Sequence, residues 1–133
     1  MEARYVFLIH WNAREAEEYA DALRDAGYDV EVEARDGRRA HDFIKDDPPD
    51  AVVIFLSRQP AVGRQTAESI MELRQMQRVP LVFVDGREDA VVKAMSEFVG
   101  ATFTKSSELS EVLNQLLASR PKRGVLSRLR NWF

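Results

Sequence analysis

The stretch Pro49-Asp50-Ala51-Val52-Val53-Ile54-Phe55-Leu56-Ser57-Arg58-Gln59-Pro60 decides the fold of this chain. Its six central residues, 51–56, are all apolar, and they follow a proline-rich turn and run into a polar loop. An uninterrupted apolar run of this length, rich in β-branched and aromatic residues, predicts a short strand that is covered on both faces. Such strands belong to parallel sheets flanked by helices, so the rest of the chain should alternate between strands and helices.

Four further segments predict strands of the same sheet. Residues 5–9 form a second apolar run, and residues 28–33 alternate apolar and charged side chains, as an edge strand with one wet face does. Residues 81–84 and 101–104 are shorter runs of the same kind. Apolar residues at helical spacing follow each of the five strands. Because the connections are only a few residues long, the pattern predicts one α/β domain with a parallel sheet and helices on both faces.

The ends of the predicted helices carry their own signals. Asn12 and Glu15 have the spacing of a capping box at the start of the first helix, which should end before Gly27. The other expected boundaries are a turn at 36–37, a loop that holds Pro60 and Gly63 before the third helix, and Ser106 or Ser107 as the cap of the last helix.

Length and composition describe a globular protein. The chain has 133 residues, of which 45% are apolar and 31% charged, which is enough apolar material for one domain with a substantial core. It has no cysteine, so it has no disulfide framework and no thiolate chemistry. No run approaches the roughly 18 apolar residues of a membrane span, and the first residues are too short an apolar run for a secretory signal. We therefore expect a cytoplasmic protein.

The last fifteen residues, 119–133, differ from the domain at 1–118. No acidic residue follows Glu111, whereas five basic residues do, so the rest of the chain carries about −8. After Pro121 and Gly124, apolar residues return at helical spacing between arginines. A basic amphipathic tail of this kind suits either a protein surface (its own domain, a partner or a second copy) or an anionic membrane surface. So few basic residues argue against nucleic acid. The expected contact residues are Leu126, Leu129, Trp132 and Phe133.

Short motifs near the predicted strands occur in a fixed order. They are Gly27-Tyr28-Asp29-Val30, Asp36-Gly37-Arg38-Arg39-Ala40, Pro49-Asp50, Val79-Pro80, Gly100-Ala101 and Lys105. In this order and spacing, residues 4–118 resemble the receiver domains of response regulators. The resemblance implies a flavodoxin-like three-layer sandwich with strand order 2-1-3-4-5, and a role in two-component or related bacterial-type signalling.

The residues that carry the chemistry of that family are mostly missing. Receivers place paired acids after the first strand, a phosphorylated aspartate at the end of the third, a hydroxyl residue after the fourth and a lysine after the fifth. A phenyl ring accepts no phosphoryl group and binds no magnesium, which takes hard oxygen ligands. We therefore expect a degenerate phosphorylation pocket without metal or cofactor. Its corresponding residues here are His10, Trp11, Phe55, Asp85 and Lys105, and Phe103 is the nearest candidate for the aromatic switch position.

Other chemical readings of these residues are weaker. Asp85 should neutralise Lys105 in an ion pair rather than hold a metal, and Ser57 is an alternative, displaced phosphoacceptor. His10 lies at the carboxyl end of a central strand, where open α/β sheets bind ligands, but a lone histidine beside Trp11 is more typical of packing. No histidine or cysteine spacing predicts a metal site, and no glycine-rich loop predicts a phosphate cradle.

The sequence supports two hypotheses from different classes. The first is a stand-alone pseudo-receiver that is not an enzyme and acts by binding a signalling protein, with homodimer formation left open. The resemblance implies a surface that comprises Val91, Val92, Met95, Phe103 and Leu109. The second is a small-ligand sensor or enzyme on the same fold. Its working residues would be His10, Trp11, Asp85 and Lys105.

Overall fold

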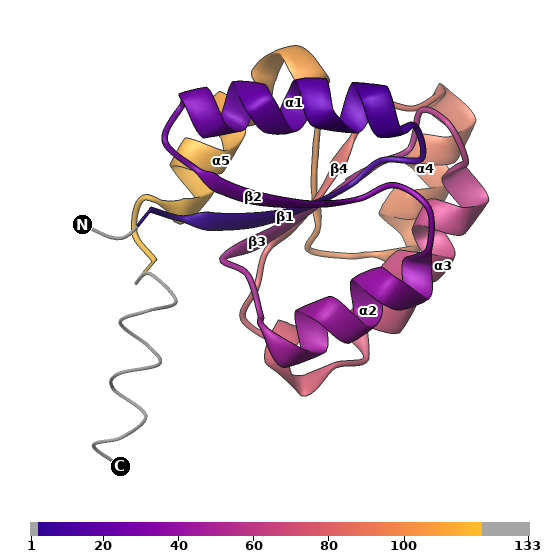
Figure 1. Ribbon diagram of the computed structural model, residues 1–133. Helices are drawn as coiled ribbons and strands as arrows, with labels where there is room; N and C mark the ends of the chain where they lie inside the picture. Colours follow the sequence, from indigo (N-terminus) through magenta and orange to yellow (C-terminus); the bar gives the residue numbers. More distant parts are fainter. Residues whose placement is uncertain (1–2, 121–133) are drawn as a thin grey trace.

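A computed structural model describes residues 3–120. Five parallel strands form one sheet in the order β2-β1-β3-β4-β5 (Figure 1). The strands are β1 (Tyr5–Ile9), β2 (Asp29–Glu33), β3 (Ala51–Phe55), β4 (Leu81–Val84) and β5 (Thr102–Thr104). The predicted sheet is confirmed in strand number, direction and order, and β2 is an edge strand whose exposure alternates as predicted except at its last residue, Glu33, which is buried.

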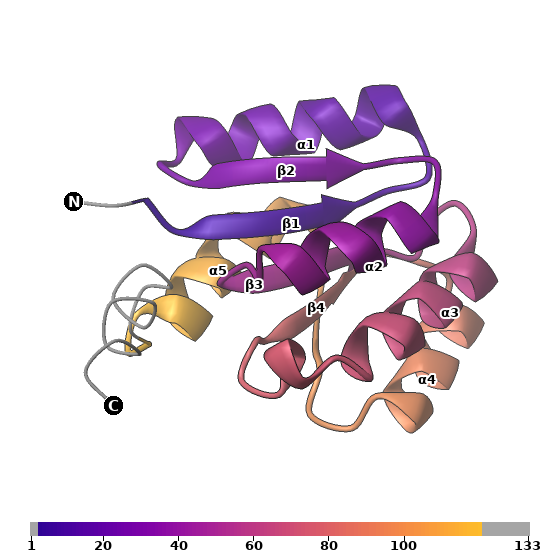
Figure 2. The ribbon, with the colours of Figure 1, turned by 60° about the horizontal axis from the view of Figure 1, so that its bottom comes forward.

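Five helices cover the two faces of the sheet, so the domain has three layers (Figures 1 and 2). One face carries α1 (Ala13–Asp25) and α5 (Leu109–Leu117). The other carries α2 (Gly37–Asp46), α3 (Pro60–Met71) and α4 (Glu88–Glu97). Short 3-10 helices at Arg74–Met76 and Ser106–Glu108 follow α3 and precede α5. Within the described range, no helix combines the length and the apolar character needed to cross a membrane.

The core consists of two apolar layers separated by the sheet. Side chains of a strand alternate between its faces, and β3 shows this throughout its length. Ala51, Val53 and Phe55 pack with α1 and α5, whereas Val52 and Ile54 pack with α2, α3 and α4. The apolar run at 51–55 is therefore buried because alternate side chains face the two helical layers, as the sequence predicts.

Several predicted boundaries are wrong in detail. Pro60 and Gly63 do not lie in a loop, because α3 begins at Pro60, where a missing backbone N–H costs no helical hydrogen bond. Gly37 is not a turn residue either. It is the first residue of α2, and the Asp36 carboxylate caps this helix by accepting the Arg38 N–H.

Gly37 is required by the packing of α2 against α3. A methyl group at this position would clash with the Thr66 hydroxyl oxygen. We expect Gly37→Ala to destabilise the domain by about 1–3 kcal/mol, and Thr66→Ala to remove most of that cost in the double variant. Urea unfolding of the four proteins measures this coupling.

Gly27→Ala is the control for this experiment. Nothing lies within 4 Å of a methyl group there, but φ is +98°, so the substitution should cost about 1 kcal/mol through backbone strain alone. That cost should not depend on residue 66. A Gly37→Ala cost that is equally independent of residue 66 would contradict the packing explanation.

Candidate functional site: a closed rim at the carboxyl ends of the strands

The candidate site lies where the strands end. His10 directly follows β1, Phe55 is the last residue of β3, and Asp85 directly follows β4. Because the strands are parallel, these ends meet at one edge of the sheet, which is where open α/β sheets bind their ligands. We call this edge the rim.

Phe55 is inside the core and not on a pocket wall. Its side chain is 1% exposed, and its ring stacks on the His10 imidazole with a centroid distance of 4.5 Å and an interplanar angle of 25°. The Tyr19 ring of α1 lies 4.7 Å from the same phenyl ring. The end of β3, where the receiver resemblance would place an aspartate, therefore holds a phenyl ring packed between His10 and Tyr19.

His10 joins this cluster to the charged residues above it. It is 1% exposed, and its Nε2 lies 3.2 Å from Glu15 Oε2. Burial lowers the pKa of His10, and the Arg58 charge lowers it further, whereas Glu15 and Asp85 act in the opposite direction. The imidazole is therefore neutral at pH 7. The Nδ1 atom of His10 is buried without a hydrogen-bond partner among residues 3–120.

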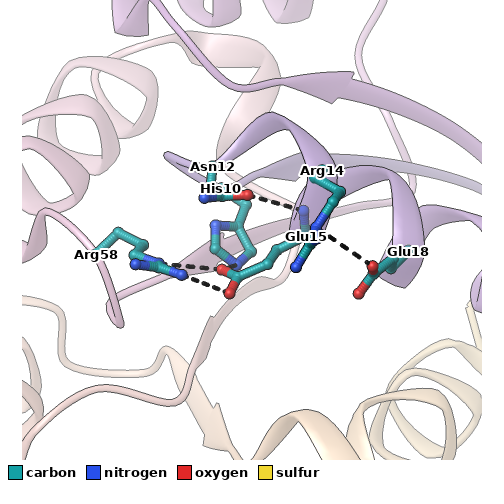
Figure 3. Close-up of polar contacts among 6 residues, drawn as sticks. All are labelled: His10, Asn12, Arg14, Glu15, Glu18 and Arg58. Atoms are coloured by element: carbon teal, nitrogen blue, oxygen red, sulfur yellow. Dashed lines mark hydrogen bonds and ion pairs between the residues drawn. The ribbon is translucent and has the colours of Figure 1, made fainter.

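An ion pair between Glu15 and Arg58 closes the rim (Figure 3). Arg58 Nε donates to Glu15 Oε2 at 3.1 Å and Arg58 Nη2 donates to Oε1 at 2.6 Å. The hydrogen bonds from Arg58 hold the pKa of Glu15 below its usual value. This bidentate contact ties the first turn of α1 to the loop between β3 and α3.

The predicted capping box is only half formed. Asn12 Oδ1 accepts the Glu15 N–H at 3.0 Å, as the motif predicts. The Glu15 carboxylate, however, points to Arg58 and His10 (Figure 3). Sequence analysis missed both Glu15 and Arg58 as rim residues. Their opposite charges at two strand–helix junctions are the only signal that could have found them.

Asp85 and Lys105 do not form the predicted ion pair. Asp85 Oδ1 accepts the Ser106 N–H at 2.8 Å, while the Lys105 side chain is exposed and has no acidic partner in the described range. Asp85 has a φ of 57°, a left-handed conformation that aspartate tolerates. The predicted serine cap is wrong too, because neither Ser106 nor Ser107 caps α5 through its side chain.

The oxygens at the rim do not fit magnesium, the metal that the resemblance implies. The Glu15 carboxylate is held by Arg58, Asn12 Oδ1 caps α1, and Asp85 Oδ1 accepts the Ser106 amide. Over residues 3–120, no three histidine or acidic side chains gather in a group that could hold a metal ion. The two carboxylates at the rim, Glu15 and Asp85, both accept hydrogen bonds from protein donors.

The residues of the alternative sensor hypothesis do not converge. His10 and Trp11 are consecutive, but their side chains pack on different faces of the sheet: His10 stacks on Phe55, whereas Trp11 packs with the α2–α3–α4 layer. Lys105 points to solvent. Of the four residues, only His10 and Asp85 are close enough for their charges to interact.

The predicted contact surface is only partly exposed. On α4, Val92 and Met95 are 58% and 49% exposed. Val91 and Phe103 are half-buried, and the Phe103 ring stacks on Phe83. Leu109 is buried beneath α5, so its assignment to the surface is wrong.

Val99, which sequence analysis missed, lies two residues after the end of α4 and is 92% exposed. We call Val92, Met95 and Val99 the α4 stripe. The predicted contact residues of the tail, Leu126, Leu129, Trp132 and Phe133, lie outside the described residues.

Comparisons with known proteins identify the fold. No protein-family model matches the sequence, and no curated protein matches it. The domain is similar to a CheY-like receiver domain from Methylobacillus flagellatus, with a TM-score of 0.72, 18% identity, and 86% of this chain and 98% of that chain covered. A putative response regulator from Chloroflexus aurantiacus matches with a TM-score of 0.74, 20% identity and coverage of 88% and 99%.

A response regulator receiver protein from Sinorhizobium medicae matches with a TM-score of 0.70, 25% identity and coverage of 90% and 98%. Each of these structures is covered almost from end to end. The chain therefore has the fold of response-regulator receiver domains, and the predicted fold class is confirmed.

The buried, neutral His10 makes stability depend on pH. Because the folded state lowers the pKa of His10 from its ordinary value of 6.5, the unfolded chain binds more protons between the two values. The free energy of unfolding should be highest above about pH 6.5 and fall as the pH drops toward the lowered pKa.

His10→Phe keeps an aromatic ring against Phe55 and should remove this component. Urea unfolding of both proteins between pH 7.5 and pH 5, roughly the range around the ordinary histidine pKa, measures it. The Glu15 contribution is separate, because its pKa is lowered from 4.5 and its stabilisation is lost only at more acidic pH. Parallel pH profiles for the two proteins would show that His10 is not the group responsible.

Proposed function

We propose that the chain is a phosphorylation-independent pseudo-receiver that works in a two-component or related signalling pathway by binding another protein. The observation that carries the proposal is Phe55, buried and stacked on His10 at the position of the phosphoacceptor. The receiver fold supports the signalling role, since the similar structures are receiver domains and response regulators.

The packing of the rim supports a single, permanent surface state. A receiver that switches needs a pocket where a phosphoryl group can arrive and be bound. Here the aromatic cluster fills that space and the Glu15–Arg58 pair covers it. Removing a buried phenylalanine ring typically costs about 3–5 kcal/mol, so emptying this space is unfavourable. The protein would therefore act as a constant binding surface, or be regulated by something other than phosphorylation at residue 55.

The α4 stripe supports protein binding. Three large apolar side chains are exposed on α4 and just after it, at positions 92, 95 and 99. Grouped apolar side chains of this kind mark interaction surfaces more often than isolated ones. Their place on α4 agrees with the surface that the receiver resemblance implies. The sensor or enzyme alternative has no comparable support, because its four residues point in different directions.

Met95→Glu tests the binding surface. A carboxylate in the middle of the α4 stripe should reduce retention of the protein partner about tenfold, because a buried contact at the centre of an interface would lose its apolar packing. The full chain serves as bait in lysate of the organism that makes it, and retained proteins are quantified by mass spectrometry.

Ala22→Glu is the matched control, since it adds the same charge to an exposed position on α1, on the other face of the sheet. Proteins retained by the original chain and by Ala22→Glu, but lost with Met95→Glu, are the expected partners, and treatment with acetyl phosphate should not alter their retention. Equal retention by all three baits would contradict the proposed surface.

A further inference from the structure

A groove lies at the opposite end of the sheet from the rim. It has a volume of about 550 Å³ and is formed where β4 and β5 begin and where α3, α4 and α5 end. This volume is within the range of about 300–1,000 Å³ that is typical of ligand pockets. The rim does not use this groove, and the surface of the proposed function shares only Val99 with it.

The lining of the groove combines a buried apolar base with exposed apolar edges. Met76 and Leu81 are buried at its base. Met71, at the end of α3, is 41% exposed, and Val99, after α4, is 92% exposed. Half-buried Phe98 lies between these levels. Large apolar side chains gathered around a hollow indicate a surface that another apolar segment covers.

The charges along the groove favour a basic occupant. Glu68 and Glu72 line it, are exposed, and have no basic partner within residues 3–120. Glu97 also lines it and pairs with Arg64 at 3.8 Å.

Arg78 and Arg120 line the groove as well. The Arg120 guanidinium, however, is engaged by backbone, since it donates to the Arg78 carbonyl oxygen at 2.9 Å and to the Leu116 carbonyl oxygen at 3.2 Å. The three glutamates of the lining outnumber its two arginines, and two of them, Glu68 and Glu72, have no basic partner in the described range.

We propose that residues 121–133 of the same chain cover this groove. Leu126, Leu129, Trp132 and Phe133 would pack on its apolar edges, and the basic residues between them would lie near Glu68 and Glu72. The segment is complementary to the groove, because it combines apolar side chains with basic residues and has no acidic residue. This proposal is independent of the proposed signalling function.

The position of Arg120 makes the contact intramolecular. Arg120 lines the groove itself, so the next thirteen residues start at its edge. Even as a helix, thirteen residues reach about 20 Å, which is ample for a groove of this size. Tethering at such a short distance gives an effective concentration on the order of millimolar, so a weak contact would still be mostly formed within one chain.

Methionine methyl NMR on the full chain tests the proposal. Met71 and Met76 line the groove, whereas Met95 lies on α4 away from the lining and serves as an internal control. With methyl-labelled methionine, the double variant Trp132→Ala/Phe133→Ala should shift the Met71 and Met76 resonances, because the two rings would no longer lie beside them. Met95 should not move, which also shows that the domain is folded.

Matched variants separate the components of the contact. Asn131→Ala alters the tail without removing an apolar group and should leave all methyl resonances in place. Glu68→Arg/Glu72→Arg should shift Met71 and Met76 toward their positions in the double variant. The control is Asp25→Arg, which reverses an exposed charge at the end of α1.

Three outcomes would overturn the proposal. Superimposable Met71 and Met76 resonances in the original chain and the Trp132→Ala/Phe133→Ala variant would show that the tail does not reach the groove. If the Met71 and Met76 resonances of the labelled double variant shift when the unlabelled original chain is added, the groove binds the tail of a second copy. A response of the tail only to phosphatidylglycerol vesicles, with no methyl shift in buffer, would assign it to a membrane. None of these measurements needs a signalling partner, so they fail or succeed separately from the proposed function.

Discussion

The stack of the Phe55 ring on the His10 imidazole, beneath the Glu15–Arg58 ion pair, is the contact on which the rim depends. It joins β1, β3, α1 and the loop before α3, the four segments that would surround an acidic pocket. The position and charge of each of these four side chains depend on the others. His10 is buried against Phe55 and burial lowers its pKa, its imidazole lies against the Glu15 carboxylate, and Arg58 balances the Glu15 charge. The arrangement satisfies the rim internally and leaves little for an incoming ligand to bind.

The residues that form the receiver-like fold are mostly different from the residues at the rim. The sheet order is that of a receiver fold, and the two apolar layers hold it together. The aromatic residue that ends β3, Phe55, belongs to one of these layers and contributes to packing. The exposed apolar features lie elsewhere, on the α4 stripe and along the groove at the other end of the sheet.

Local sequence patterns were sufficient for the fold and insufficient for the rim. Apolar runs and helical spacing located the five strands and the five α-helices of the described residues, but not the two 3-10 helices, because burial leaves a direct trace in residue type. The prediction that the chain lacks a phosphoacceptor also rests on one residue, Phe55. The contact between Glu15 and Arg58 does not, since it joins side chains 43 positions apart and competes with a capping role for Glu15. In the same way, the Asp85 carboxylate accepts a nearby backbone amide rather than meeting Lys105.

Treatment of the purified full chain with acetyl phosphate and Mg²⁺, followed by intact-mass spectrometry, tests most directly whether the rim has lost its chemistry. A receiver domain with its acidic pocket intact, treated in parallel, must gain the mass of one phosphoryl group. We expect this chain to gain none, because an aromatic ring occupies the acceptor position and the nearby carboxylates are held by protein donors. Uptake of a phosphoryl group at any residue, including Asp85 or Ser57, would contradict a phosphorylation-independent pseudo-receiver.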